Sequence, residues 1–200
     1  RTSLIPGLIE ALNYNINNNR KDIQLFEMGN VHIEEGKVRE EHMVVSGILY
    51  GLVCPETIHE QGKMKNHSIF IVKGHMEALM TSIVQGNIKI KSENNSLFTL
   101  GFSINHKKTM LGKFGKISDS FIKNEINSDI QEVYGFELIT DHLLKYMKEN
   151  TLYTPVSKYP KIERELNFIL SNTLDSGEIM TFIKNSGKGL IKRINPVNLY

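Results

Sequence analysis

Residues 1–12 read RTSLIPGLIEAL, and the spacing of apolar residues that starts here decides the fold of the first part of the chain. The apolar side chains recur at i, i+3, i+4, i+7 and i+11, and they are Ile5, Leu8, Ile9, Leu12 and Ile16. This spacing places all of them on one face of an α-helix. Pro6 suits the first helical turn, because its missing N–H would have no partner there. The stretch therefore predicts an amphipathic helix over residues 4–17.

Downstream of this helix the pattern changes to the two-residue period of β-strands. Residues 23–28 alternate in this way and the period resumes at 31–33, which predicts a strand with a bend or bulge at Gly29. Further strands are expected at residues 42–50, 87–91, 97–104, 109–117 and 130–139, and helices at residues 70–83, 119–126 and 141–148. Strands with helices set among them favour an α+β fold built on an antiparallel sheet.

A change of structural unit is expected near residues 150–160. Pro155 and Pro160 interrupt every periodic pattern there. The predicted domains are residues 1–153 and 154–200.

The second unit has the pattern of a β-α-β motif. Apolar and polar residues alternate over 162–170, which predicts a strand. Asp175 and Glu178 form a capping-box pair that opens a helix, and residues 190–200 can supply another strand. This order of elements is half of a ferredoxin-like fold.

The composition describes a chain that can bury a core. It has 200 residues, of which 40% are hydrophobic and 23% charged, and its mean hydropathy is -0.25. No window approaches the roughly 18 apolar residues of a membrane span. The single cysteine, Cys54, cannot form an internal disulfide, which agrees with a reducing compartment. We expect a soluble, cytoplasmic protein without a membrane partner, and the initial Arg1 suggests a piece of a longer chain.

Residues that carry chemistry do not occur at catalytic or metal-binding spacings. Of the 7 histidines, none pairs with a cysteine or with a second histidine at ligand spacing. There is no G-x-S-x-G elbow and no Walker loop. Paired acids at residues 34–35 and 40–41 are best interpreted as the solvated connection of a hairpin, because neighbouring strand residues point to opposite faces. The sequence predicts no catalytic residue and no metal site.

Positive charge is concentrated in the last quarter of the chain. Residues 158–200 carry 7 basic and 4 acidic side chains, a net +3, whereas residues 1–157 carry 17 and 18, a net −1. Tyr159, Phe168 and Tyr200 lie among the basic residues. Charge combined with aromatic stacking platforms is one way in which proteins bind RNA. A nucleic-acid surface and an ordinary solvated face are both open interpretations of this pattern.

Five segments resemble motifs of one family and follow the family's order. Residues 1–12 and 25–31 (LFEMGNV) are similar to the opening helix and the following strand of the β subunit of bacterial-type phenylalanine-tRNA ligase. The other three segments are Phe70 with Lys73-Gly74, residues 134–138 (YGFEL), and Tyr159-Pro160 with Arg164-Glu165-Leu166. Together they extend the resemblance over nearly the whole chain.

The resemblance implies a C-terminal piece of that subunit. Residues 1–153 would form a class II synthetase-like antiparallel sheet with helices and no active site of its own, and residues 154–200 would begin a ferredoxin-fold anticodon-binding domain. The sequence independently supports the missing activity. Adenylation requires arginines against the ATP phosphates, and residues 30–34 (NVHIE), where a class II motif usually places one, contain none.

The resemblance also implies partners. The chain would pack against a catalytic α subunit in an α2β2 enzyme that uses ATP and Mg²⁺ to attach phenylalanine to tRNA(Phe), with no cofactor bound to this piece. Candidate contacts with that subunit lie on two apolar helices and are Leu8, Leu12, Ile16, Met76 and Leu79, with burial inside their own domain as the alternative. Candidate RNA-binding residues are Lys161, Arg164, Lys192 and Arg193. Arg164 matches a family position, and the other three rest on charge.

Two other functions stay open from the sequence. The chain could be a free-standing RNA-binding or regulatory protein that has the same fold. It could also be an enzyme whose site lies in the long loop at residues 51–67 and acts through His59 or His67.

Overall fold

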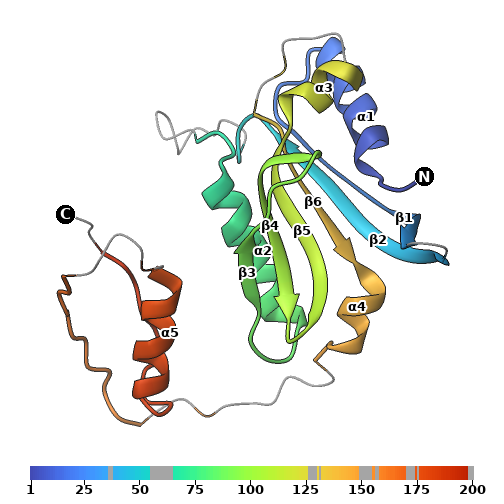
Figure 1. The fold of residues 1–200 in the computed structure, drawn as a ribbon. Helices are drawn as coiled ribbons and strands as arrows, with labels where there is room; N and C mark the ends of the chain where they lie inside the picture. Colours follow the sequence, from blue (N-terminus) through green and yellow to red (C-terminus); the bar gives the residue numbers. More distant parts are fainter. Residues whose placement is uncertain are drawn as a thin grey trace. The chain divides into compact units, whose positions relative to one another are not determined.

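The computed structural model describes residues 1–35, 38–54, 65–125, 130, 132–148, 155, 158–169, 174 and 176–197. The chain divides into two compact units, Arg1–Leu152 (unit 1) and Tyr153–Tyr200 (unit 2). Figure 1 shows the helices and strands of each. The identities of the two units as named domains stay predictions.

Unit 1 is built on one six-stranded sheet. Its strands are β1 (Ile23–Glu35), β2 (Val38–Tyr50), β3 (Lys89–Ser92), β4 (Phe98–His106), β5 (Thr109–Ile117) and β6 (Tyr134–Ile139). They lie in the order β1-β2-β6-β5-β4-β3, and every neighbouring pair is antiparallel. The predicted α+β class with an antiparallel sheet is confirmed.

Helices cover both faces of this sheet (Figure 1). They are α1 (Ile5–Asn17), α2 (Ile69–Ile83), α3 (Asp119–Glu125) and α4 (Thr140–Lys145). Ile48 and Leu49 are consecutive on β2 and therefore point to opposite faces. Ile48 packs in the cluster that contains the buried side chains of α1, whereas Leu49 packs in the cluster that contains those of α2. The predicted helices at 4–17 and 70–83 are confirmed, and each supplies the core of one face.

The prediction of a bend or bulge in β1 is wrong. β1 pairs with β2 without any shift of register, from Ile23 opposite Tyr50 to Glu35 opposite Val38. At Gly29, a Cβ atom would lie 2.7 Å from Nη2 of Arg1, the end of a flexible side chain. That guanidinium pairs with Glu27 at 2.9 Å, and the Arg1 carbonyl accepts a hydrogen bond from His32 N at 2.9 Å. These two contacts hold the start of the chain against β1.

Unit 2 confirms the predicted helix but not the predicted strands. Its helix is α5 (Ser176–Ser186), and Asp175 of the capping-box pair lies outside the described residues. The described residues 160–169 and 190–197 form no strand, so the β-α-β prediction is wrong for them. Alternation defines which face of a strand would be apolar, but a strand also needs a neighbouring backbone to accept and donate hydrogen bonds. None of the described residues of unit 2 supplies one.

Membrane insertion is a separate question. Among the helices that the structure describes, none combines the length and the hydropathy that a membrane span requires.

A buried carboxylate fastens α1 to the sheet. Glu137 is the only acidic residue in the otherwise apolar β6 segment YGFELI and is 8% exposed. Its Oε1 accepts hydrogen bonds from Ser3 Oγ at 2.6 Å, Ser46 Oγ at 3.3 Å and Leu4 N at 3.4 Å. Its Oε2 lies 3.8 Å from the Lys113 ammonium. Because Oε1 sits at the N-terminus of α1, the helix dipole also favours its negative charge.

We expect Glu137→Ala to destabilise the chain by about 3 kcal/mol, because it leaves two hydroxyls, a backbone N–H and an ammonium without their acceptor. The measurement is the free energy of unfolding from urea denaturation monitored by circular dichroism. Glu10→Ala, which removes an exposed carboxylate from α1, is the matched control and should change stability by less than about 0.5 kcal/mol. Equal effects of the two substitutions would contradict the role given to Glu137.

Candidate functional site

The helix residues predicted to contact a partner are mostly buried in unit 1 itself. Leu8, Leu12 and Met76 are 5%, 0% and 5% exposed, and their side chains belong to the two cores under α1 and α2. These three side chains match the alternative of burial inside their own domain, because the apolar faces of both helices cover the sheet, and their contact with a partner stays a prediction. Ile16 and Leu79 are half-buried and pack against the same cores.

A different part of unit 1 carries exposed apolar side chains. Phe26 and Met28 of β1 are 78% and 62% exposed, and Met43 of β2 is 40% exposed. The register sets Phe26 opposite Gly47 and Asn30 opposite Met43, so the three side chains share one face of the β1–β2 hairpin. This face is the one that carries Leu49, and α1 packs on the other. We call these three residues the apolar strip.

The sequence contained a signal for the apolar strip. Alternation along residues 23–28 places Ile23 and Leu25 on one face of β1, which the structure buries or half-buries. It places Phe26 and Met28 on the opposite face. A strand of an isolated domain normally has a polar solvent face. Large apolar residues on both faces of β1 are therefore a sequence signal that its second face is not an ordinary solvent face.

The histidines near α4 make contacts that hold this part of unit 1 together. His42 lies 3.4 Å from Glu40 Oε2 and 3.7 Å from Asp141 Oδ2, and Asp141 also accepts a hydrogen bond from Met43 N at 3.2 Å. His142 Nδ1 lies 2.7 Å from the Met110 carbonyl oxygen. These contacts fasten α4 to neighbouring strands. Among the described residues, no group of three or more His, Cys, Asp and Glu side chains could hold a metal ion.

His67, one of the two histidines considered for an enzyme in the loop at 51–67, has a structural position. Its side chain is buried, and its Nε2 lies 3.2 Å from Gln24 Nε2, which also donates to the Val53 carbonyl at 3.0 Å. With the Gln24 amide nitrogen as the donor, His67 Nε2 is the acceptor, and the buried Nδ1 of His67 has no hydrogen-bond partner among the described residues. Burial, with a smaller contribution from the charge of His75, lowers the pKa of His67. His59 lies outside the described residues.

The four predicted RNA-binding residues all lie on the surface of unit 2. Lys161, Arg164, Lys192 and Arg193 are exposed. Lys161 pairs with Glu163 at 2.7 Å, Arg164 Nη1 donates to the Glu163 carbonyl at 3.3 Å, and Arg193 Nε donates to Asn195 Oδ1 at 3.1 Å. These are surface contacts of small energy, which leave the charges available to a phosphate group.

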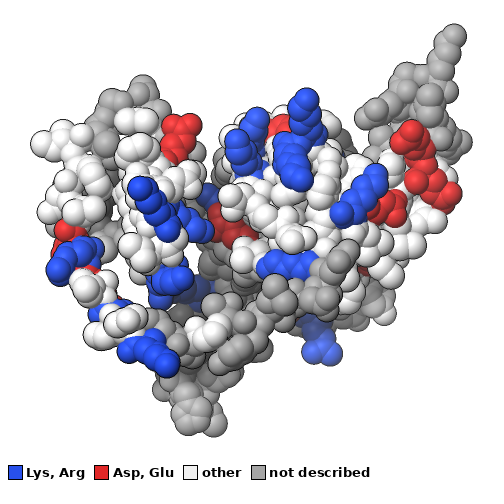
Figure 2. All heavy atoms as spheres, turned by 90° about the horizontal axis from the view of Figure 1, so that it is seen from below, with Lys and Arg blue, Asp and Glu red and all other residues white. Residues whose placement is uncertain are grey.

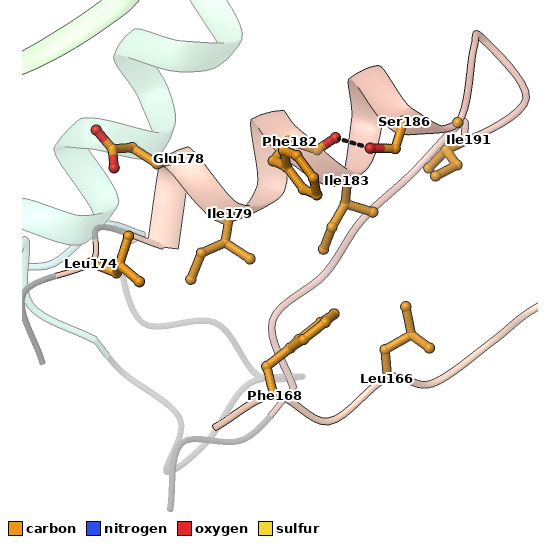
Figure 3. A pocket seen from close by; sticks show the side chains of 10 residues that line it. Leu166, Phe168, Leu174, Glu178, Ile179, Phe182, Ile183, Ser186 and Ile191 are labelled. Atoms are coloured by element: carbon orange, nitrogen blue, oxygen red, sulfur yellow. Dashed lines mark hydrogen bonds between the residues drawn. The ribbon is translucent and has the colours of Figure 1, made fainter. Parts of the chain in front are cut away.

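Unit 2 also contains an apolar cavity of about 770 Å³. Figure 3 shows Ile179 and Ile183 of α5 on one side of it and Leu166 and Phe168 of the preceding segment on the other. α5 has no buried residue, and Phe182, which also lines the cavity, is 74% exposed. The apolar side chains of unit 2 thus face one another without closing a core.

Comparisons with known proteins point to one family. The family model described as "Phenylalanyl tRNA synthetase beta chain CLM domain" matches residues 1–140. The phenylalanine–tRNA ligase beta subunit of Bacillus subtilis (strain 168) is 30% identical over 207 residues, which cover 100% of this chain and 25% of that protein. The beta subunit of Listeria monocytogenes serotype 4b is 29% identical over 212 residues, with the same shares covered. The chain spans about a quarter of the length of these relatives, and its expected place in their C-terminal part stays a prediction.

Among solved structures, a pyrrolysyl tRNA synthetase from Desulfitobacterium hafniense matches at 15% identity with a TM-score of 0.49. The match covers 72% of this chain and 48% of that one. A likeness this loose carries no argument about function.

The buried His67 predicts a pH dependence of stability. Because its folded-state pKa is below the ordinary value of 6.5, the unfolded chain binds the proton more readily. The contribution of His67 to stability should therefore be complete above pH 6.5 and be lost as the pH falls from 6.5 toward the lowered pKa. Urea denaturation at several pH values should show a shallower acid-side slope for His67→Gln than for the wild type. His32→Gln, at a half-buried histidine of β1, is the control, and an unchanged slope in His67→Gln would contradict the assignment.

Proposed function

Because the chain belongs to the phenylalanyl-tRNA synthetase beta chain family, we propose that it is a non-catalytic portion of a phenylalanine-tRNA ligase. In this proposal unit 1 supports a catalytic α subunit, and unit 2 takes part in binding tRNA(Phe). The assembly would be an α2β2 enzyme of the cytoplasm that attaches phenylalanine to tRNA with ATP.

The observation that carries this proposal is the apolar strip of Phe26, Met28 and Met43. Burying Phe26 and Met28 against a partner would contribute on the order of 4 kcal/mol, before the entropic cost of association is subtracted. Residues of this size and type are enriched at the centres of protein interfaces. A beta chain by its name has a second kind of chain as its partner, and we assign the strip to contact with that α subunit.

The residues of this chain support a non-catalytic role. ATP would need guanidinium or ammonium groups around its phosphates, and the Mg²⁺ bound with it would need one or two carboxylates besides those phosphates. Arg1, which lies beside β1, is already paired with Glu27. Residues 30–34, where a class II motif usually places an arginine, contain none, and we assign ATP and Mg²⁺ to the α subunit.

The proposed role of unit 2 rests on charge. Lys161, Arg164, Lys192 and Arg193 are exposed, and lysine and arginine on a protein surface bind RNA mainly through its phosphates. The alternative function is a free-standing RNA-binding or regulatory protein of the same fold. The two proposals differ in whether the chain needs the α subunit, since only the first gives the apolar strip a partner.

The assembly proposal predicts that the 200-residue chain, co-expressed with the catalytic α subunit of the same organism, co-elutes with it in size-exclusion chromatography with light scattering. Phe26→Asp/Met28→Asp should weaken this assembly at least about tenfold, because two charges would be buried at the contact. Phe70→Asp is the matched control, because Phe70 is 82% exposed but lies on α2 rather than in the strip.

The chain eluting alone under all conditions would favour the free-standing alternative. If Phe70→Asp disrupts the complex and Phe26→Asp/Met28→Asp does not, the contact lies elsewhere on unit 1 and the assignment of the strip fails.

The RNA-binding proposal predicts that replacing Lys161, Arg164, Lys192 and Arg193 together by glutamine weakens binding to a tRNA(Phe) transcript about tenfold or more. The slope of log Kd against log salt should fall, by about one for each phosphate that the variant no longer neutralises. Fluorescence anisotropy titrations at several KCl concentrations measure both quantities. If this variant has the affinity and the salt slope of the wild type, the proposal that unit 2 contacts RNA is wrong.

A further inference from the structure

One end of the unit 1 sheet carries five lysines on three separate segments. Lys107 and Lys108 form the two-residue turn between β4 and β5, and Lys89 begins β3 opposite Asn105. The last two, Lys145 and Lys148, lie at the end of α4 and just beyond it. We call this set the lysine end.

Hydrogen bonds hold the three segments of the lysine end together. Val84, which follows α2, pairs with Met147, and Gln85 N donates to the Tyr146 carbonyl at 2.8 Å. The Tyr146 hydroxyl lies 2.9 Å from Thr109 Oγ1 at the β4–β5 turn. The Tyr146 ring packs against His106 with ring centroids 4.6 Å apart. The lysines are therefore displayed from a fixed framework with Tyr146 at its centre.

The charge of the lysine end is not balanced within the described residues. Residues 83–92, 104–110 and 142–148 contain no aspartate or glutamate, and Glu149, which follows, lies outside the described residues. None of the five lysines forms an ion pair with a described carboxylate, although Lys148 Nζ donates to the Thr81 carbonyl in the last turn of α2. Three lysines elsewhere in unit 1 form pairs, Lys73 with Glu77, Lys113 with Glu137 and Lys116 with Asp119, whereas Lys21, Lys65, Lys91 and Lys123 form none with a described carboxylate but are not gathered at one end of the sheet. Figure 2 views the protein from this side and shows Lys and Arg side chains standing out from unit 1.

The turn places its first lysine at a cost in backbone energy. Lys107 has φ of 54°, a left-handed conformation that L-residues other than glycine, asparagine and aspartate rarely adopt. Two-residue hairpin turns usually place glycine or asparagine where φ is positive. A lysine in this conformation, held over the Tyr146 ring with Nζ 5.8 Å from the centroid, is a costly choice for a turn that served only to connect strands.

We infer that the lysine end binds the phosphate backbone of RNA without reading its sequence. The inference rests on the proposed function, in which the chain works on tRNA, and adds a second RNA contact, on unit 1, to the one proposed for unit 2. Lysine is a point charge that suits phosphates rather than base edges. Tyr146, whose hydroxyl and ring are engaged with Thr109, His106 and Lys107, is not free to stack on a base. Binding would reduce the repulsion among the five positive charges. It would also release the counterions that are condensed on the RNA.

The test is the affinity of the 200-residue chain for a fluorescein-labelled tRNA(Phe) transcript, measured by anisotropy between about 50 and 200 mM KCl. The variant Lys107→Gly/Lys108→Asn removes both lysines and puts residues that are common in hairpin turns in their place. Glycine then stands at position 107, where φ is positive. The Kd of this variant should rise about tenfold. The slope of its log Kd against the log of the salt concentration should fall by about two. Its thermal midpoint should rise by about 2 °C, because the left-handed lysine is removed. A loss of affinity in this variant could not be ascribed to unfolding.

The matched control is Lys73→Gln/Lys123→Gln, which removes the same charge from α2 and α3 at the opposite end of unit 1 and should change Kd less than about twofold. A transcript of another tRNA should bind the lysine end equally well, because the phosphate backbone is common to both. A turn variant that binds as tightly as the control would overturn the inference. So would a poly-glutamate peptide that competes as well as tRNA, since the partner would then be an acidic protein.

Failure of this inference and failure of the proposed function are distinguishable. The quadruple glutamine variant of unit 2 tests the unit 2 contact in the same assay with the lysine end intact. Co-elution with the α subunit tests the scaffold role without RNA. If the wild-type chain binds no tRNA, the lysine end is overturned, and the scaffold role is still decided by co-elution.

Discussion

Burial of both faces of β2 is the constraint on which the rest of unit 1 depends. Because β2 lies between β1 and β6, its consecutive residues Ile48 and Leu49 must each be covered from a different side. The cover comes from the apolar faces of α1 and α2. The helices leave the apolar strip near the edge of the sheet uncovered, and this is the surface to which we assign the proposed partner. The same constraint explains why the Glu137 carboxylate is needed, since it fixes the start of α1 over the sheet that the helix covers.

The parts of the fold that depend on local periodicity could be predicted from sequence. The stripe from Ile5 to Ile16 defined the extent of α1, and the alternating segments indicated the antiparallel strands of unit 1 to within a few residues. What failed depends on distant residues. The unbroken register of β1 with β2 and the contacts of Arg1 with Glu27 and His32 join residues far apart in the chain, and no period reveals them. In unit 2 the alternation at 162–170 is real, but a strand needs a partner that periodicity does not supply.

The candidate surfaces also divide into those that local sequence patterns reveal and those that depend on distant residues. Amphipathic helices were assigned to a partner because their apolar faces are visible in the sequence, yet such a face more often covers its own core, as Leu12 and Met76 do. Exposure of Phe26 depends on where α2 lies over the sheet, which is a tertiary property. Basic residues were sought where they are dense in sequence, in the last quarter. The lysine end escaped notice because Lys89, Lys107 and Lys145 come together only through the sheet and the contacts of Tyr146.

The two edges of the sheet differ in a way that bears on the life of the chain in a cell. β3 is an edge of four residues that carries Lys89 and Lys91, a short and charged border of the kind that resists pairing with other strands. β1, at the other border, is 13 residues long and has Phe26 and Met28 beside it. Long apolar edges recruit further strands from identical chains. Whenever this border is left uncovered, the chain would consequently tend to self-associate through β1, so that the amount of soluble chain would depend on what covers the border as well as on the stability of the fold.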